Sequence, residues 1–505
     1  MKNFVFCVVA PALFSLLSCT SKDSINKEYD IIAETIQLNE LDSEMATVRD
    51  YVPRYANIAH RGTTYWAPEE TESSWRWARH MGTDYLEADI QCSKDKVLLA
   101  VHDNNFSRTT DIDTAFGANF LKLRRRFYGS FKNADGTQHF SNEDIEEQIH
   151  FDSLLGFERN ARDYYYAEIL MLDAGKWFND ANAERARKNF ASDGLATHLT
   201  IKSKEDKIVY SNGQYVSALR DLLAFASGQI LKRDKDGRRV LGYEIKEEFH
   251  NMTLRQIRER PLEKRGTNLD GKHYDSNSRY MDFVSYDFEN AYCNDTIACE
   301  NLPGVYIEFK ESSLQPLDIV ALTYLLLDFE GWNIITKPSM EKDFFKSGNV
   351  NVGKTNGKVI LQTFRLEALE MVENVFKGKI PMCYLIDDEP PVDWDPSHYF
   401  DDPQSATLVI DYAVKHKCHI IGPSIDGEPN NYPNRCHPWQ QTLIHRAGML
   451  LHAWSIDSKH QMMEGMDAMF TNRTDLTLEW LIKHNLRPKE LTVPSAEALL
   501  DKLGY

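Results

Sequence analysis

The sequence predicts an α/β fold, a TIM-type (β/α)8 barrel with a large insertion between its second and third strands. In the C-terminal half, short apolar runs typical of buried strands alternate with helical stretches, and the strand count approaches eight. This alternation indicates parallel strands joined by helices, and eight strands suit a closed barrel better than an open sheet. The stretch between Asp103 and Pro303 breaks the alternation and is too long for an ordinary connection, so we interpret it as an insertion with its own structure.

The apolar runs place the individual elements. Strands are expected before His60, on either side of Glu87, and then over 305–310, 358–364, 382–386, 419–422, 449–456 and 468–471. Helices are expected over 317–329, 366–376, 405–415 and 441–447. Barrel enzymes place their chemistry at the C-terminal ends of the strands, so polar residues at those ends are the candidates for a site.

The N-terminus is similar to a bacterial lipoprotein signal. Lys2 precedes an apolar run over 4–17 that is too short to span a bilayer, and Leu16-Leu17-Ser18-Cys19 resembles a lipobox. The resemblance implies cleavage before Cys19 and diacylation of its thiol; the alternative is an ordinary secretory signal with an incidental cysteine. We therefore expect an exported protein that is anchored by lipid to a bacterial membrane, in the periplasm or at the cell surface.

The domain organisation follows from these segments. We expect a signal peptide over 1–19, a polar tether over 20–52, a barrel over 53–485 with its insertion at about 112–300, and a C-terminal tail over 486–505.

The formal net charge of −18 argues against nucleic acid as a ligand and against strong binding to anionic membranes. Among the cysteines beyond Cys19, Cys293 with Cys299 and Cys418 with Cys436 are plausible local disulfides, although free buried thiols are equally compatible with the sequence.

Three short motifs carry the chemistry: His60-Arg61-Gly62, Glu87-Ala88-Asp89 and His102-Asp103. They end or interrupt short apolar runs over 57–59, 85–86 and 97–101, which we interpret as buried strands that bring these side chains to one edge of a sheet. Histidine titrates near neutrality, and carboxylates two residues apart on a strand point to the same face. The motifs therefore predict acid/base groups beside a site for a hard cation.

In order and spacing, these motifs resemble the glycerophosphodiester phosphodiesterase family. That family's pattern runs from His-Arg-Gly through Pro-Glu-Asn-Thr and Glu-x-Asp to His-Asp followed by Arg-Thr-Thr, and the sequence has Pro68-Glu69-Glu70-Thr71 and Arg108-Thr109-Thr110 at the corresponding places. The resemblance spans about 58–481 and is strongest over 58–110. It implies a barrel of the phospholipase C-like phosphodiesterase type and metal-dependent hydrolysis of glycerophosphodiesters to sn-glycerol 3-phosphate and an alcohol.

The resemblance also implies a role for each candidate residue. His60 and His102 would be the acid/base pair, in an order that the sequence leaves open. Glu87 and Asp89 would bind Ca²⁺ or Mg²⁺, which prefer oxygen ligands. The third metal ligand would be Glu308 or, as the alternative, Glu244; the order of strand and helix favours Glu308. Arg61 and Lys310 would bind the phosphate, and Glu69 would support the site. Trp454 would face the glycerol carbons of the substrate; the alternative is that it is a core residue.

The sequence departs from the family pattern at two of these motifs. Glu70 replaces the usual asparagine, which puts the local hydrogen bonding in doubt, and Asn472 replaces a late aspartate that we expect to be peripheral to the chemistry.

Two other functions remain open. One is a lipid-directed phosphodiesterase, such as a phosphatidylinositol-type phospholipase C or a lysophospholipase D, with the aromatic-rich insertion contacting lipid. The other is a surface lipoprotein that binds ligand without catalysis. The oligomeric state is open.

Overall fold

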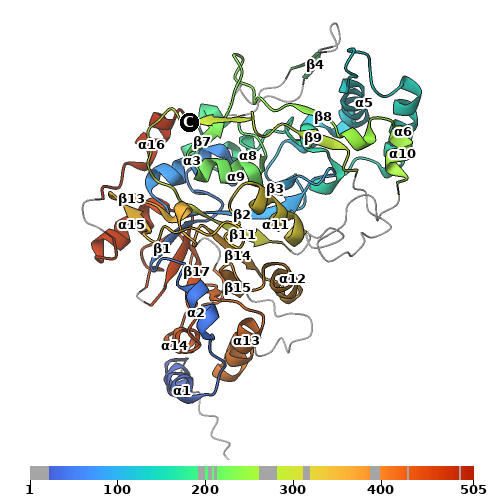
Figure 1. Cartoon of the computed structure of the whole chain (residues 1–505). Helices are drawn as coiled ribbons and strands as arrows, with labels where there is room; N and C mark the ends of the chain where they lie inside the picture. The colour runs from blue at the N-terminus through green and yellow to red at the C-terminus, as the bar shows by residue number, and fades with distance from the viewer. Residues whose placement is uncertain are drawn as a thin grey trace, which may run out of the picture.

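The computed structural model describes residues 22–190, 200–202, 207–209, 213–260, 281–310, 319–386, 399–428, 431–463, 465–487 and 491–505. Eight parallel strands form a closed barrel, in which β1 pairs with both β18 and β2 and so joins the two ends of the sheet (Figure 1). This confirms the predicted fold class. The barrel strands are β1 (Ala56–Ala59), β2 (Tyr85–Cys92), β11 (Gly304–Phe309), β14 (Val359–Thr363), β15 (Met382–Ile386), β16 (Ile420–Pro423), β17 (Leu450–Ile456) and β18 (Ala468–Thr471).

Helices cover the outside of the barrel between successive strands. They are α3 (Glu72–Met81), α11 (Ile319–Phe329), α12 (Leu366–Phe376), α13 (Pro403–Lys415), α14 (Pro438–Arg446) and α15 (Thr474–Lys483). Between β2 and β11 this position is taken by α9 (Leu219–Ala226), which contacts both strands. Between β17 and β18 the described residues form no α-helix. Capping at the N-terminus of α13 is an example of how the sequence starts these helices. Asp402 accepts hydrogen bonds from the first backbone amides of α13, and Pro403 occupies the first turn of the helix.

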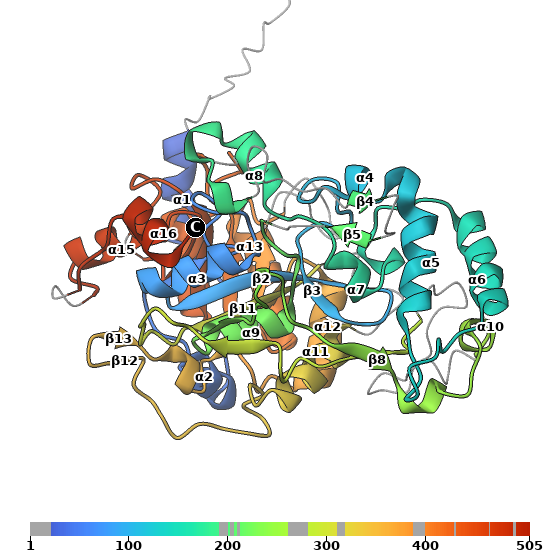
Figure 2. The ribbon, with the colours of Figure 1, turned by 90° about the horizontal axis from the view of Figure 1, so that it is seen from above.

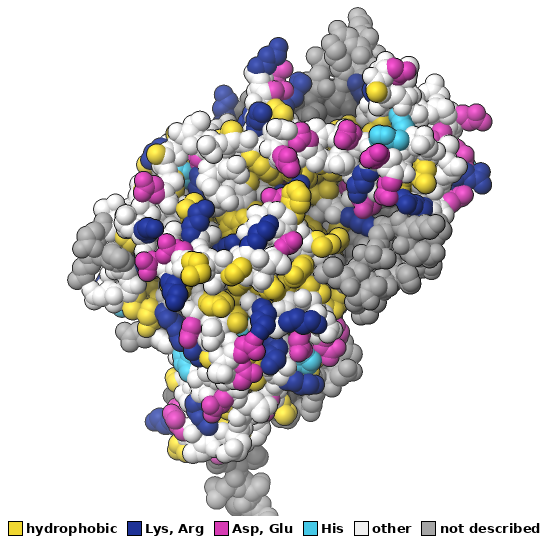
Figure 3. Space-filling model, in the orientation of Figure 1, with side chains coloured by type: hydrophobic (Ala, Val, Ile, Leu, Met, Phe, Trp, Pro, Cys, Tyr) yellow, Lys and Arg dark blue, Asp and Glu magenta, His cyan; other side chains and the backbone are white. Residues whose placement is uncertain are grey.

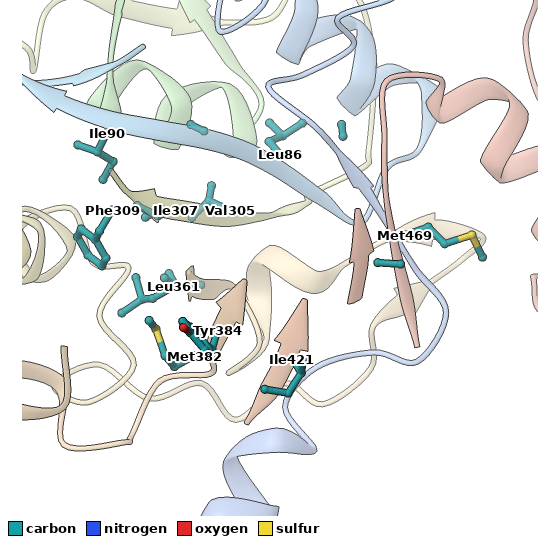
Figure 4. Close-up of a cluster of buried hydrophobic side chains, with 14 of the residues drawn as sticks. Leu86, Ile90, Val305, Ile307, Phe309, Leu361, Met382, Tyr384, Ile421 and Met469 are labelled. Carbon is teal, nitrogen blue, oxygen red and sulfur yellow. The ribbon is translucent and has the colours of Figure 1, made fainter. Parts of the chain in front are cut away.

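The inner and outer faces of the barrel follow from the alternation of side chains along each strand. On β2 and β11, Leu86, Ile90, Val305 and Ile307 face the helices and pack with residues of neighbouring strands (Figure 4). Their sequence neighbours therefore face the barrel interior, where a second cluster that includes Tyr85 and Tyr306 fills the lower half. The same alternation turns the acids of β2 and the acid of β11 inward, toward the upper end.

One strand expectation is wrong. The apolar run over 97–101 is not a barrel strand: β3 (Leu98–Ala100) pairs antiparallel with β2. A tight turn causes this reversal, because the Ser93 amide donates to Val97 O at 3.0 Å and Lys96 adopts a left-handed φ of 63°. Strand β2 also runs continuously through Glu87 instead of breaking there. The insertion therefore begins with this hairpin.

The insertion forms a separate lobe beside the barrel, with α5, α6 and α10 farthest from it (Figure 2). Two apolar clusters give it cores of its own. Tyr164, Tyr165 and Tyr166 are fully buried in these cores, so these three side chains do not offer the lipid contact that the lipid-directed alternative assigns to the insertion. Besides α9, the insertion contains β3, α4 (Ile112–Ala115), α5 (Phe120–Ser130), α6 (Asn142–Leu155), α7 (Tyr166–Ile169), α8 (Lys176–Ala181), β4 (Thr200–Lys202), β5 (Lys207–Val209), β6 (Ser217–Ala218), β7 (Gln229–Leu231), β8 (Tyr243–Ile245), α10 (Leu254–Arg258), β9 (Val284–Tyr286) and β10 (Tyr292–Asn294).

Both expected peripheral segments lie folded against the barrel. In the expected tether, α1 (Lys22–Thr35) packs on α14, and α2 (Ser43–Arg49) follows it. The Asn39 amide donates to Asp411 Oδ1 at 2.6 Å. In the expected tail, α16 (Ala496–Leu503) packs on α3, where Trp77 Nε1 donates to Ala496 O at 3.0 Å. Cys19 and the rest of the signal lie outside the described residues.

The cysteines beyond Cys19 are all free, so neither suggested disulfide forms. Cys418 and Cys436 are buried in the apolar layer between barrel and helices, and Cys299 Sγ instead lies 3.9 Å from Arg79 O. Within the part of the chain that the structure describes, no helix has both the length and the hydropathy of a bilayer span.

Candidate active site

Three carboxylates meet at the upper end of the barrel interior. Glu87 and Asp89 come from β2 and Glu308 from the adjacent β11, and one oxygen of each lies within 4.8 Å of the others. The register of the two strands explains this, because Glu308 is the partner of Asp89. All three side chains are buried. Glu244, the alternative third ligand, lies on β8 in the insertion, where it is exposed and far from this group in the fold.

Two cations offset the charge of this group. Lys310 Nζ lies 2.6 Å from Glu308 Oε1 and 3.1 Å from Asp89 Oδ1, and Arg61 Nε lies 3.0 Å from Asp89 Oδ2. Although burial opposes ionisation, Lys310 and Arg61 hold the pKa of Asp89 well below its usual range. Burial, with repulsion from Asp89, raises the pKa of Glu308 to about 7 and that of Glu87 well above its usual value.

The carboxylates fit a divalent cation. Neither side-chain oxygen of Asp89 has a hydrogen-bond donor in good geometry among the described residues, although both are buried. Burial of several like charges is unfavourable unless countercharges are close. Oxygen ligands from carboxylates are what Mg²⁺ and Ca²⁺ require. The donor set is therefore that of a divalent-metal site.

The loop after β1 is held tightly over this site. Arg61 adopts a left-handed φ of 50°, and its backbone amide donates to Glu87 Oε2 at 2.6 Å. Gly62 has a φ of 91°, and a Cβ atom there would lie 2.4 Å from Ser74 Oγ, so only glycine fits. Glu70 accepts a hydrogen bond from the Asp89 amide at 2.8 Å and its own amide donates to Arg61 O at 2.9 Å. Glu70 thus ties the loop to β2.

His60 points into the pocket from the end of β1. Its Nδ1 atom lies 2.7 Å from Asn472 Oδ1, which also accepts a hydrogen bond from Thr64 Oγ1 at 2.6 Å. Burial and the positive charge of Arg61 lower the pKa of His60 to about 3. The imidazole is therefore neutral at pH 7. The prediction that Asn472 is peripheral to the chemistry is wrong, because Asn472 contacts His60 directly.

His102 follows β3 at the edge of the pocket and has a carboxylate partner. Its Nδ1 atom lies 2.6 Å from Asp103 Oδ1, and Asp103 Oδ2 in turn accepts from Arg108 Nε at 2.6 Å. Arg108 makes a two-point contact with Glu69, at 2.6 and 3.0 Å. The hydrogen bond from His102 is the largest cause that holds the pKa of Asp103 well below its usual range.

A cavity of about 310 Å³ joins these groups. Both histidines, Glu87 and Glu308 line it, together with Arg61 and Lys310. The opposite wall is aromatic: Trp454 makes edge contacts with Phe364 at 5.3 Å and with Tyr432 at 5.0 Å between ring centroids, and its Nε1 donates to Gly422 O at 2.8 Å. The predicted residues other than Glu244 and Cys19 are thus brought together around one pocket, with Glu69 behind Arg61.

Four residues that support the site are not among the site residues predicted from the sequence. Gln362 on β14 donates to Glu87 Oε1 at 3.0 Å and lines the pocket. Asn472 and Asp103 form hydrogen bonds with His60 and His102, respectively. Glu70 accepts a hydrogen bond from the Asp89 amide. Asp103 and Glu70 lay within the recognised motifs, so their positions were a usable signal. Gln362 and Asn472 are ordinary polar residues at strand ends, and only the closure of the barrel brings them to the site.

Comparison with known proteins agrees with the motifs. Residues 60–240 match the model of the glycerophosphoryl diester phosphodiesterase family. A glycerophosphodiester phosphodiesterase of Bacillus subtilis (strain 168) is 28% identical over 137 residues, which cover 27% of this chain and 31% of the relative. A glycerophosphoinositol inositolphosphodiesterase of Mus musculus is 36% identical over 177 residues, which cover 35% of this chain and 26% of the relative. The chain thus spans under a third of the length of these curated relatives.

Among solved structures, a glycerophosphodiester phosphodiesterase from Agrobacterium tumefaciens aligns over 84% of this chain and 99% of its own, with 14% identity and a TM-score of 0.40. One from Parabacteroides distasonis aligns over 86% of this chain and 99% of its own, with 11% identity and a TM-score of 0.39.

Proposed function

We propose that this chain is a member of the glycerophosphodiester phosphodiesterase family and hydrolyses glycerophosphodiesters to sn-glycerol 3-phosphate and an alcohol. The observation that carries this proposal is the convergence of two histidines, three carboxylates, Arg61 and Lys310 on one pocket. Cleavage of a phosphodiester needs neutralisation of the phosphoryl charge, a base for the nucleophile and an acid for the leaving alkoxide. The pocket offers a group for each requirement.

In this proposal, Glu87, Asp89 and Glu308 would hold Ca²⁺ or Mg²⁺. When bound, the cation supplies positive charge next to the phosphoryl oxygens. Arg61 contributes a planar guanidinium that fits a phosphate, and Lys310 contributes a point charge. Glu69 forms ion pairs with Arg61 and Arg108 on the side away from the pocket and so fixes their positions. The face of Trp454 offers an apolar wall for the glycerol carbons.

The partners of the two histidines suggest how they divide the proton transfers. Asn472 offers His60 only an amide oxygen, so His60 Nδ1 carries the proton and neutral Nε2 can accept one. Burial lowers the pKa of His102, but the Asp103 carboxylate opposes this effect by stabilising the imidazolium form. We therefore assign the base that activates the nucleophile to His60 and the acid that protonates the leaving oxygen to His102.

The direct test is hydrolysis of lipid-free glycerophosphocholine by the purified chain, with and without added Mg²⁺ or Ca²⁺. We expect metal-dependent release of choline and sn-glycerol 3-phosphate, lost in His60→Ala and Glu87→Gln. Glu244→Gln is the matched acid control and should keep full activity. Cleavage of intact phospholipids alone would favour the lipid-directed alternative. Binding without turnover would favour the non-catalytic one.

We also propose that the protein is exported and attached to a membrane through diacylated Cys19. The support is the sequence alone, a short apolar run ending in Leu16-Leu17-Ser18-Cys19. Mass spectrometry of the mature N-terminus from membrane fractions tests this: a lipid-modified cysteine is expected, and an unmodified N-terminus in the soluble fraction would contradict it. Cys19→Ser should abolish the modification.

A further inference from the structure

The outer surface of α11 and the loop that follows it exposes large apolar side chains. Leu325 is 48% exposed and Phe329 62%; they lie four residues apart, on one face of the helix. Further along the loop, Ile335 is 37% exposed and Met340 91%. We call these four residues the α11 patch. Contiguous exposed apolar surface on a folded protein marks an interaction site more often than isolated apolar residues do.

Hydrogen bonds tie the loop that carries Ile335 and Met340 to the end of α11 and to the segment before β14. Thr336 Oγ1 donates to Asp328 Oδ1, and Lys337 Nζ donates to Asp328 O at 2.8 Å, so the loop folds back on the end of α11 beside Phe329. Farther along, the Ser339 amide donates to Asn356 Oδ1 at 2.7 Å, and Ser339 Oγ donates to Lys354 O. Met340 is thereby held next to Lys354. Figure 3 shows hydrophobic and basic side chains intermixed on the face of the molecule that carries α11.

Between the loop and the barrel lies a cavity of about 370 Å³ with three lysines in its wall, Lys337, Lys354 and Lys358. Lys358 Nζ donates to Gly331 O at 2.8 Å, and its pKa is lowered by burial and by the charges of Lys354 and Lys337. Among the described lining residues, the one carboxylate is Glu330, which pairs with Arg220 at 2.6 Å. The cavity therefore has a local positive potential in a chain whose net charge is −18.

We propose that this surface docks on an anionic phospholipid bilayer, with a headgroup phosphate in the lysine-lined cavity and the α11 patch in the interfacial layer. Apolar side chains beside clustered lysines are the combination that binds anionic lipid surfaces. The net negative charge of the whole chain does not prevent this, because at physiological salt charges are screened beyond about 8 Å. The local field of the lysines, and not the net charge of the chain, therefore determines whether this surface attracts anionic lipid.

The position of this surface leaves the catalytic pocket open. Lys358 directly precedes β14, whereas Gln362 and Phe364, at the other end of that strand, line the catalytic pocket. A five-residue strand separates the two cavities by roughly 17 Å. Docking would therefore hold the barrel by its N-terminal rim and leave the site accessible to water-soluble diesters.

The test is sedimentation of the full chain with vesicles of phosphatidylcholine, alone or mixed with phosphatidylglycerol at about 7:3. The variants are Lys337→Gln/Lys354→Gln and, separately, Met340→Glu; all three side chains are exposed, so the fold should tolerate the changes. Matched controls in the insertion are Lys232→Gln/Lys235→Gln and Leu154→Glu, the last at a side chain that is 72% exposed. The N-terminus is the same in every protein compared, so its own contribution to vesicle binding does not distinguish the variants.

We expect affinity for the phosphatidylglycerol vesicles to fall about 25-fold in the lysine pair, since each lysine near the surface contributes about fivefold. Met340→Glu should also weaken binding, and the controls should not. Hydrolysis of glycerophosphocholine should be unchanged in all four variants. Equal binding to both kinds of vesicle, or equal loss in patch and control variants, would overturn the proposal. So would a dimer that Met340→Glu dissociates, because the patch would then be an interface between copies.

Discussion

His60 Nδ1 lies 2.7 Å from Asn472 Oδ1, and Thr64 Oγ1 donates to the same oxygen. An amide oxygen can only accept, so both neighbours must donate to it. This arrangement fixes the tautomer of His60 and leaves Nε2 unprotonated toward the pocket. The hydrogen bond to Asn472 and the charge of Asp89 only partly offset the effects of burial and of Arg61, so the pKa of His60 is lowered to about 3.

The first prediction concerns Asn472. Asn472→Leu should leave the His60 ring without its acceptor and reduce kcat by about tenfold or more, because the base is no longer held in one tautomer. Asn472→Asp should retain an acceptor and add a negative charge, which raises the pKa of His60. The low-pH limb of kcat/KM should then move to higher pH. Thr64→Val removes the other donor to the same oxygen and is the control. An unmoved limb in Asn472→Asp would exclude His60 as the base.

The second prediction separates the roles of the two histidines. A glycerophosphodiester with a p-nitrophenol leaving group needs little protonation of the departing oxygen. His102→Ala should therefore lose at least about 100-fold on glycerophosphocholine and far less on the activated substrate. His60→Ala should lose activity on both substrates alike. If the two variants responded in the opposite way, the assignment of acid and base would have to be exchanged.

The parts of the fold and site that follow from local patterns could be predicted. Met382–Ile386 and Ala468–Thr471 match the expected strands, because parallel barrel strands are continuous apolar runs. The run over 97–101 has the same composition, yet it turns back antiparallel, since direction is set by the turn at Ser93 to Val97 and not by the run itself. Glu308 could be preferred over Glu244 only through the order of strands and helices. The contact between His60 and Asn472 joins the first and last barrel strands, so it depends on closure, which no local pattern reports.

The third prediction links metal binding to protons. The pKa of Glu308 is raised to about 7, and that of Glu87 is also raised, so the metal-free site holds at least one proton at pH 6. Metal binding requires the ionised carboxylates. Binding should therefore release a proton at pH 6 and progressively less as pH rises above 7, and affinity should increase over the same range. Titration calorimetry in two buffers of different ionisation enthalpy measures the release.

Variants of the two candidate ligands provide the comparison for this titration. Glu308→Gln should weaken metal binding by about 100-fold and reduce proton release, since it removes both a ligand and a titrating group. Glu244→Gln should bind as the unmodified chain does. Proton release that is the same at pH 6 and pH 9 would contradict the coupling of the buried carboxylates to the metal.

The fourth prediction concerns Asp295, which attaches the insertion to α3. Its carboxylate, 4% exposed, accepts hydrogen bonds from Arg76 at 2.6 and 2.8 Å and contacts Arg79 and His80. Burial opposes its ionisation, but Arg76 and its other donors hold the pKa of Asp295 well below the usual value. Asp295→Asn would leave two buried arginines without their countercharge, so we expect a loss of about 3–5 kcal/mol in the free energy of unfolding at pH 7.

The pH dependence of this loss has a definite sign. A carboxylate whose folded pKa is depressed stabilises the fold fully above its unfolded pKa, near 4, and loses that contribution as pH falls toward the folded value. Urea unfolding at pH 7 and pH 3 should therefore show a large difference between the unmodified chain and Asp295→Asn at pH 7 that narrows at pH 3. Asp180→Asn, which removes an exposed partner of Lys176, should cost no more than about 0.5 kcal/mol at either pH. A constant difference at both pH values would mean that the variant acts through packing and not through the charge of Asp295.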